Sequence, residues 1–491
     1  MNSIEHHDVV IVGAGLSGIG AACRLRTEFP DRTFVVLESR AALGGTWSLF
    51  NYPGVRSDSD IFTLSYPFKP WRGADSIADG RSILEYLEEA AVESGIDRKI
   101  RYSSKVVAAE WDSASSRWTL TIEGVGGPDD GRVRTMTCDF LYACAGYYDY
   151  DQGYTPEFEG IDTFTGTVVH PQFWPPALDY ADKRVAVIGS GATAITLAPA
   201  LARAAGHVTM LQRSPTWIFP VPRRDVFADW MRAILPDLVA HRVVRAKNIA
   251  FTGGLYWFCR RYPRGARILL RGMVSLALRD RALVAEHFTP SYAPWDQRLC
   301  ATVNSDLFTA IRRGDVSMVT DQVDSFVPRG IRLSSGRVID ADVVVTATGL
   351  RMRVFGGIEF AVDGRPVKMS DEFLWQGTMV TGMPNFAAGI GYANAAWTLR
   401  ADLNSRLVGR VLRHIDRHGG APVTPRVEGP LGERPFLDLS SGYIQRSIAD
   451  FPRQGDRAPW RATHYLRDSL AVRTTRLSRT LRRLVSADAS N

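Results

Sequence analysis

The sequence predicts an α/β protein with two Rossmann-like dinucleotide-binding domains, the second of which carries an inserted helical subdomain. Three observations carry this prediction. Short β-branched runs at 9–12 and 184–188 lead directly into glycine-rich turns and then into small helix-forming residues. A stretch at 223–287, rich in Arg, Leu and aromatic residues, has a helical pattern. The chain of 491 residues is also longer than one hydrophobic core usually supports.

The first glycine-rich turn contains Gly13, Gly15 and Gly18. Gly13 allows the tight turn, Gly15 lets the backbone approach a pyrophosphate, and Gly18 lets the helix pack closely on the strand. A second strand at 33–37 ends in Glu38, where a dinucleotide fold places an acid that hydrogen-bonds ribose hydroxyls. The combination predicts a dinucleotide site at this turn.

The second turn has the order Gly189-Ser190-Gly191-Ala192-Thr193-Ala194, with alanine at the third small position. Its next strand, at 207–211, ends in Gln212-Arg213-Ser214 instead of an acid. An acid would repel a 2′-phosphate, whereas Arg213 pairs with it and Ser214 donates to it. The acidic tip of the first unit and the basic tip of the second therefore predict FAD and NADPH, respectively.

Two further apolar runs, at 140–146 and 343–349, end in small residues and fit the strands that close each nucleotide fold. They place the NADP domain inside the FAD domain. The predicted order is FAD domain, NADP domain, helical insertion, NADP domain and FAD domain, with the boundaries 1–150, 151–222, 223–290, 291–380 and 381–491.

The composition excludes several classes of protein. A hydrophobic fraction of 45% and a charged fraction of 23% are ordinary for globular proteins, so no long disordered region is expected. The net charge is +7, but the basic residues form no nucleic-acid-binding motif, so we expect no nucleic acid partner. Five cysteines without a C-x-x-C pair predict neither a disulfide framework nor a metal site. The amino terminus has no leader pattern, which favours a cytoplasmic location.

Three segments bear on membrane contact. The charge-free run 373–399 contains Pro384 and four glycines, which fit turns better than a membrane span. Two basic amphipathic stretches, Leu255–Leu283 and Leu466–Leu484, interleave apolar residues with arginines at helical spacing. Either stretch lies on the inner face of the cell membrane, as a peripheral contact, or packs on its own protein. The pattern leaves both alternatives open.

A motif beyond the nucleotide folds resembles one of a known family. Gly44-Gly45-Thr46-Trp47, followed by Tyr52-Pro53-Gly54 and Asp58, resembles a motif of the Baeyer-Villiger monooxygenases, which are class B flavoprotein monooxygenases. Pro171, where many members of that family have Thr, resembles the actinobacterial ethionamide-activating subgroup. The residues that match the family's second fingerprint are Phe164, Gly166, His170, Trp174 and Pro175.

The resemblance implies a set of site residues. The positions where the family contacts FAD are Ser17, Glu38, Thr46, Trp47, Ser48, Leu49, Asp58 and Val106. The positions where it contacts NADP are Arg56, Ser57, Asp58, the run from Gly189 to Ile195, Arg213 and Ser214. Arg298 falls at the position of the family's active-site arginine.

The chemistry that the resemblance implies is the transfer of hydride from NADPH to FAD, followed by formation of a C4a-peroxyflavin with O2. Arg298 is then expected to balance the peroxide's charge, and Asp58 to orient the guanidinium. The expected substrates are small apolar ketones, which give esters or lactones, and sulfur compounds such as thioethers or thioamides. His170 is expected to be structural, because it lies in a linker.

Three other functions are compatible with two dinucleotide folds. A flavin-containing monooxygenase acting only on nitrogen or sulfur shares the folds, but Trp174 and Arg298 argue against it. A disulfide reductase needs a redox cysteine pair where this chain has Gly45-Thr46-Trp47. A non-catalytic nucleotide-binding protein at a membrane surface is the third. The substrate and the oligomeric state are not given by the sequence.

Overall fold

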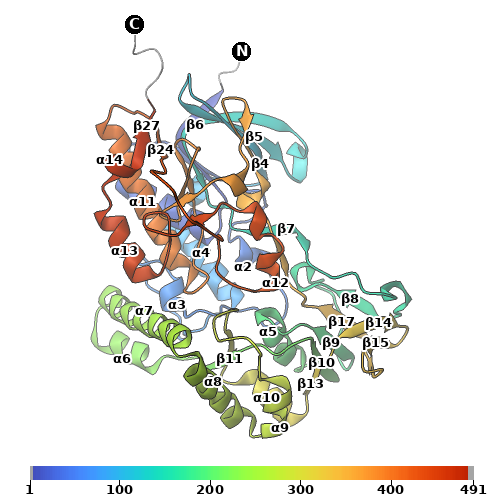
Figure 1. Ribbon diagram of the computed structural model, residues 1–491. Helices are drawn as coiled ribbons and strands as arrows, with labels where there is room; N and C mark the ends of the chain where they lie inside the picture. Colours follow the sequence, from blue (N-terminus) through green and yellow to red (C-terminus); the bar gives the residue numbers. More distant parts are fainter. Residues whose placement is uncertain (1–3, 485–491) are drawn as a thin grey trace.

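Two large twisted sheets, each built around one of the predicted glycine turns, organise the computed structural model, in which residues 4–484 are described. In Figure 1 the first unit lies above, the second lies below it at the right, and a group of helices lies below at the left. Each sheet has its own apolar core, which agrees with the α/β class predicted from the sequence.

The first sheet is centred on β1 (Glu5–Val12), which leads through the first glycine turn into α1 (Leu16–Glu28). On one side β1 pairs in parallel with β2 (Phe34–Leu37), which in turn pairs with β3 (Ile100–Arg101). On its other side β1 pairs in parallel with β6 (Val133–Ala143). The antiparallel strands β4 (Ser104–Asp112) and β5 (Arg117–Gly124) extend the sheet from β6.

The chain returns to this sheet after the second unit. β19 (Glu359–Val362) pairs with β4 and with β20 (Arg365–Pro366), and β23 (Phe386–Ala388) pairs in parallel with β6. The boundary that the sequence placed at 380 is therefore too late, because the return begins at Glu359. The sequence did not indicate this return, because the strands of this segment are short and weakly patterned. β21 and β22, for example, are only Leu374–Trp375 and Met379–Val380.

Helices cover the first sheet. The 21-residue α11 (Trp397–Arg417) packs against α1, so residues nearly 400 positions apart form one layer. The remaining elements of this unit are α2 (Thr46–Leu49), α3 (Ile61–Leu64), α4 (Gly80–Glu93), β24 (Val423–Pro425), β25 (Glu433–Arg434), α12 (Gly442–Gln445), β26 (Gln454–Gly455), α13 (Tyr465–Thr474), α14 (Leu477–Thr480) and β27 (Leu481–Arg483).

The second sheet is five-stranded and parallel, in the order β13-β10-β9-β17-β8. Its bounds are β8 (Thr167–Val169), β9 (Arg184–Ile188), β10 (His207–Gln212), β13 (Val316–Thr320) and β17 (Val343–Thr346). The second glycine turn joins β9 to α5 (Ala192–Leu201), and α10 (Asp306–Arg313) precedes β13. A small antiparallel sheet of β14 (Val323–Val327), β15 (Gly330–Leu333) and β16 (Val338–Asp340) follows, and β18 (Leu350–Met352) pairs with β7 (Tyr148–Gly153) in the two linkers.

The helical segment lies within 223–290, the range that the sequence assigned to an insertion. Its elements are α6 (Val226–Ile234), α7 (Asp237–Arg261), α8 (Pro263–Leu278) and α9 (Arg281–His287). Asp225 caps α6 and Asp280 caps α9 by accepting from backbone N–H groups of the first turn. β11 (Ile218–Val221) and β12 (Cys300–Val303) pair in parallel and hold the two ends of the insertion together.

The tail differs from its predicted form. Leucines at helical spacing suggested one amphipathic helix over Leu466–Leu484, but α13 ends at Thr474 and Thr475 is extended. The chain then forms the single turn α14 and the strand β27, which pairs with β24. Leu477, in α14, and Leu481, which pairs with β24, are both buried. The expectation of one continuous helix is therefore wrong beyond residue 474, and the buried Leu477 and Leu481 agree with the alternative that this stretch packs on its own protein.

Candidate functional site

A single cleft of about 1030 Å³ runs between the two units, and both glycine turns open into it. Most of the site residues predicted from the sequence line this cleft, although they come from segments separated by up to 285 positions. They are Gly13, Gly15, Ser17, Glu38, Thr46, Trp47, Arg56, Ser57, Asp58, Val106, Gly189, Ser190, Gly191, Ala192, Thr193, Arg213, Ser214 and Arg298.

Five predicted residues lie outside the cleft lining: Gly18, Ser48, Leu49, Ala194 and Ile195. Gly18 faces the strand, because a Cβ there would lie 1.8 Å from the Gly13 carbonyl oxygen. Ala194 and Ile195 are fully buried on the core side of α5. The Ser48 hydroxyl accepts a hydrogen bond from Arg40 at 2.7 Å. Gly18, Ser48, Ala194 and Ile195 therefore pack or hydrogen-bond within the protein and do not face the cleft.

The first turn has the form that a dinucleotide requires. Gly13 has φ +101°, which a glycine adopts without strain, whereas a Cβ on Gly15 would meet only Gly45, at 3.5 Å. The carboxylate of Glu38 accepts from the backbone N–H of Ala14 at 2.7 Å, which fixes it at the end of β2 beside the turn. An open glycine backbone at a helix N-terminus and an adjacent fixed acid fit the pyrophosphate and ribose of FAD.

The second turn is equally open but ends differently. No atom lies within 4 Å of a Cβ built on Gly191. Arg213 and Ser214 follow β10, are exposed and line the cleft. Within residues 4–484, the Arg213 guanidinium makes no ion pair. A cation with no carboxylate partner at the tip of the second strand fits the 2′-phosphate of NADP.

Arg298 and Asp58 meet between the two turns. Arg298 Nε lies 3.2 Å from Asp58 Oδ2, and the two side chains are 33% and 31% exposed, opening on the cleft. The Asp58 carboxylate raises the pKa of Arg298 above its ordinary value, against the opposing effect of burial. Asp58 is free for this role because the neighbouring Asp60, and not Asp58, caps α3 by accepting from Thr63 N.

Aromatic side chains that were not among the predicted site residues form a wall beside this pair. Tyr147 packs against Tyr148 and Trp397, with ring centroids 4.7 and 5.0 Å apart, and Tyr443 also lines the cleft. Burial raises the pKa of each of these tyrosines, so they stay protonated donors. The indole of Trp397 donates to Ser17 Oγ at 2.7 Å, which ties the wall to the first turn.

Arg56 takes part in the contact between the two units. Its guanidinium pairs with the carboxylate of Asp306, at the start of α10. The side chain therefore bridges the first unit to the second, in addition to lining the cleft at the predicted NADP position.

The hydrogen bonds and the burial of His170 and Cys300 argue against a reactive role for either side chain. His170 Nε2 donates to Gly349 O at 3.1 Å, Nδ1 accepts from Gln172 N at 3.2 Å, and burial lowers the pKa of the ring. A neutral histidine that joins the two linkers agrees with the structural role expected for it. Burial raises the pKa of Cys300 to about 12, so its thiol stays protonated.

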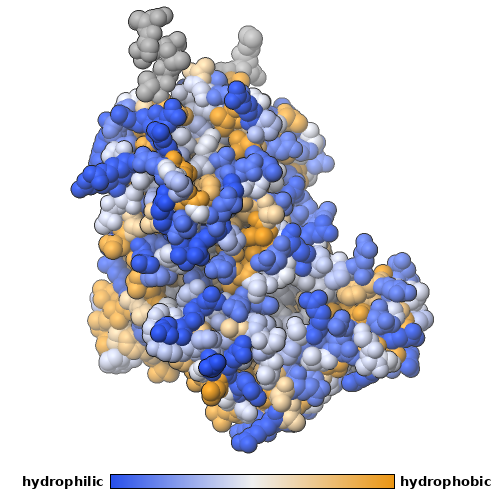
Figure 2. All heavy atoms as spheres, viewed as in Figure 1, coloured by the Kyte–Doolittle hydropathy of each residue, from blue (hydrophilic) through white to orange (hydrophobic). Residues whose placement is uncertain are grey.

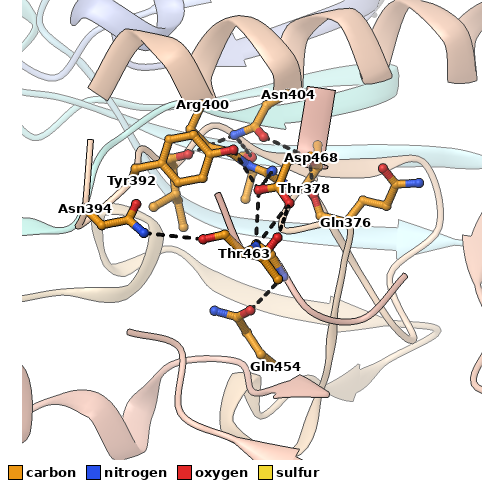
Figure 3. A network of polar contacts seen from close by, with 12 residues as sticks. Gln376, Thr378, Tyr392, Asn394, Arg400, Asn404, Gln454, Thr463 and Asp468 are labelled. Atoms are coloured by element: carbon orange, nitrogen blue, oxygen red, sulfur yellow. Dashed lines mark hydrogen bonds and ion pairs between the residues drawn. The ribbon is translucent and has the colours of Figure 1, made fainter. Parts of the chain in front are cut away.

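A buried polar network supports the loop that carries part of the cleft wall (Figure 3). Asp468, on α13, lies 3.0 Å from Arg400 Nη1 and accepts from the Tyr392 hydroxyl at 2.7 Å. The backbone N–H of Thr463 also donates to Asp468, and Asn394 donates to Thr463 O at 3.3 Å. Tyr392 lines the cleft, so the tail of the chain positions a site residue from behind.

Two protein-family models match the chain. The flavin-binding monooxygenase-like model covers residues 66–228, and the NAD(P)-binding Rossmann-like domain model covers residues 11–75. Both matches fall on the segments that build the two turns and the first half of the cleft.

Whole-chain comparisons extend the similarity. The FAD-containing monooxygenase EthA of Mycobacterium tuberculosis is 47% identical over 96% of this chain and 96% of its own length. The putative FAD-containing monooxygenase MymA of the same species is 48% identical, over 95% of this chain and 94% of its own. Among solved structures, an oxidised steroid monooxygenase bound to NADP superposes with a TM-score of 0.72 at 25% identity, over 86% of this chain and 88% of its own.

Proposed function

This chain belongs to the FAD-containing monooxygenases, and we propose that it inserts one oxygen atom of O2 into ketones, giving esters or lactones, and also oxidises sulfur substrates. It is an NADPH-dependent flavin enzyme that holds both FAD and NADP. The observation that carries the proposal is the ion pair of Arg298 with Asp58, set between the two dinucleotide turns.

FAD, reduced by NADPH, supplies the activation of O2 when both are bound. With FAD bound, Arg298 would balance the negative charge that develops in the site, because its guanidinium stays positively charged at any physiological pH. Asp58 holds the guanidinium in one orientation through a charge-assisted hydrogen bond. The two residues are therefore proposed as the catalytic pair.

The tyrosine and tryptophan wall is proposed to keep water from the reacting centre. Tyr147, Tyr148 and Trp397 present ring faces and edges beside Arg298, and the protonated hydroxyls supply hydrogen-bond donors but no base. An apolar wall with a few fixed donors suits a small apolar substrate that carries one polar acceptor, such as a carbonyl group.

The predicted cofactor contacts follow the two turns. We assign FAD to the turn at Gly13–Gly15 with Glu38, and NADPH to the turn at Gly189–Gly191 with Arg213 and Ser214. The open glycine positions and the opposite charges of the two strand ends support this assignment.

Two substrate classes are proposed on different grounds. The likeness to a protein named steroid monooxygenase, and to one named cyclohexanone monooxygenase, favours ketones. An oxidant held beside a fixed cation also transfers oxygen to a thioether or thioamide sulfur, which supports the second class. No helix within residues 4–484 is long and apolar enough to cross a bilayer.

The test is the fate of isotopically labelled dioxygen. The wild-type enzyme is incubated with NADPH and phenylacetone, or with thioanisole, and product mass, NADPH consumption and hydrogen peroxide are measured together. We expect one labelled oxygen in the ester and in the sulfoxide. NADPH consumption without labelled product contradicts the proposal, and a labelled sulfoxide without ester contradicts its ketone part.

Arg298→Ala is expected to lower product per NADPH by roughly 100-fold, with the lost turnover appearing as hydrogen peroxide. The matched control is Arg353→Ala, because Arg353 also lines the cleft but pairs with Asp151, away from Asp58. Equal product yields from Arg298→Ala and wild type overturn the assignment of Arg298.

A further inference from the structure

The net charge of the helical insertion exceeds that of the whole protein. Residues 223–287 contain thirteen Arg and Lys against five Asp and Glu, a net charge of +8. The whole chain has a net charge of +7, so the remaining residues together carry −1. The basic character of the protein is therefore local to α6–α9 and is not a general property of its surface.

The outer side of α6 is apolar where a surface helix is usually polar. Val226, Trp230 and Ile234 are spaced by four residues and are 80%, 58% and 55% exposed. Ala228 and Met231, on the opposite side of the same helix, are buried. The helix thus has two apolar faces, of which only one is covered by the protein.

Neighbouring helices continue this surface. Val239, Val243 and Trp257 are exposed along α7, and Ile268 and Leu276 along α8. Figure 2 shows apolar side chains gathered at the lower left, over α6 and α7. We call these five residues, together with Val226, Trp230 and Ile234, the α6–α8 face. Exposed apolar residues gathered on adjacent helices mark an interaction site on a folded protein.

Arginines lie on the same helices. Arg242, Arg264 and Arg271 are exposed, and within residues 4–484 none of the three makes an ion pair. Apolar and aromatic side chains together with unpaired cations match the two layers of an anionic lipid surface. We propose that the α6–α8 face binds peripherally to an anionic lipid bilayer.

The position of this face relates it to the cleft. The junction of α7 and α8 packs on an aromatic layer that includes Trp217 and Trp295, and Tyr256 contacts Trp295 edge-on at 5.3 Å. Trp295 stands three residues before Arg298, so one aromatic layer separates the bilayer-facing helices from the segment that carries the proposed catalytic arginine. An apolar substrate dissolved in the bilayer has a short path to the site. Lipid binding itself does not rest on the reaction proposed above.

The experiment is flotation of the FAD-loaded enzyme with vesicles, without substrate. One set of vesicles is phosphatidylcholine alone, and the other is phosphatidylcholine mixed with phosphatidylglycerol. We expect flotation with the anionic vesicles, weaker flotation with the neutral ones, and a marked loss between about 0.1 M and about 1 M salt, where screening removes the arginine contribution.

Two variants separate the apolar and charged contributions. Val226→Ser/Trp230→Ser/Ile234→Ser is expected to lower the partition coefficient at least ~10-fold. Arg242→Gln/Arg264→Gln/Arg271→Gln is expected to lower it by roughly 100-fold on anionic vesicles only, at about fivefold per arginine. NADPH oxidation checks that each variant is folded.

The controls carry three serine or three glutamine substitutions on exposed residues elsewhere: Phe68→Ser/Val92→Ser/Val133→Ser and Arg98→Gln/Arg332→Gln/Arg337→Gln. Flotation of the controls should equal that of the wild type. Failure of the wild-type enzyme to float with either vesicle overturns the proposal. So does a wild-type dimer that the serine variant abolishes in the absence of lipid, because the face is then a contact between protein copies. Equal losses in test and control variants also overturn it.

Discussion

The preference for NADPH is predicted to depend on Arg213. In Arg213→Ala, the 2′-phosphate loses a charge-assisted contact from a side chain that makes no ion pair of its own within the described residues. Such a hydrogen bond contributes about 1.5–3 kcal/mol, and the exposure of Arg213 favours the lower end because solvent screens it. A loss of about 1.5 kcal/mol corresponds to roughly a tenfold fall in kcat/KM for NADPH.

The same change leaves NADH untouched, because NADH carries no 2′-phosphate. We therefore measure steady-state oxidation of both coenzymes, for wild type, Arg213→Ala and the control Arg313→Ala, which removes an exposed arginine of α10. The expected result is a fall confined to NADPH and to Arg213→Ala, and smaller at high salt. Equal falls for NADPH and NADH, or an unchanged NADPH value, would refute the assignment of the second turn.

Three further outcomes are expected. Gly18→Ala should abolish accumulation of folded enzyme, because the added Cβ would overlap the backbone of the first turn. Gly15→Ala should give folded enzyme that loses FAD on gel filtration. Loss of folding in both variants would contradict this prediction. Asp468→Asn leaves the buried Arg400 guanidinium without its anion, which costs about 3 kcal/mol of stability. We expect the Tm to fall by roughly 5 °C in differential scanning fluorimetry. A change under about 1 °C argues against the network. Burial, and secondarily Arg245, lowers the pKa of His241 to about 4. As the pH falls below about 6.5, the His241 ring therefore takes up a proton in the unfolded chain before it does so in the folded protein. The free energy of unfolding should fall by about 3 kcal/mol between about pH 6.5 and about pH 4. His241→Phe should remove that part of the pH dependence in urea unfolding, and an unchanged slope counts against it.

The elements that the sequence predicted are those determined by local pattern. The β-branched runs at 9–12 and 184–188 are strands of the two sheets, and the turns that follow them open into the cleft. In each unit the strand, the glycine turn and the helix follow one another directly in the sequence, so the pattern itself indicates the turn. The helical stretch at 223–287 was equally local, since its caps and apolar spacing are contained in it.

The meeting of Asp58 with Arg298 was available only through the family resemblance. The two residues lie 240 positions apart and come together because the second unit is inserted into the first. Tyr147 and Tyr443 were missed as wall residues for the same reason, as neither has a local pattern that distinguishes it from an ordinary core tyrosine. For the tail, the local pattern gave a wrong prediction. The leucine spacing is helical, but from Leu481 onward the chain is a strand that pairs with β24.

The insertion of one unit into the other imposes an order on synthesis. The second sheet is complete once residue 346 has left the ribosome, since all of its strands lie between 167 and 346. The first sheet still lacks β23, and α1 lacks its partner α11, until some seventy residues more have emerged. The nascent amino-terminal half therefore waits with α1 uncovered while the middle of the chain folds. A ribosome stalled between these points would present a finished second unit beside an unfinished first unit, with the apolar side of α1 exposed.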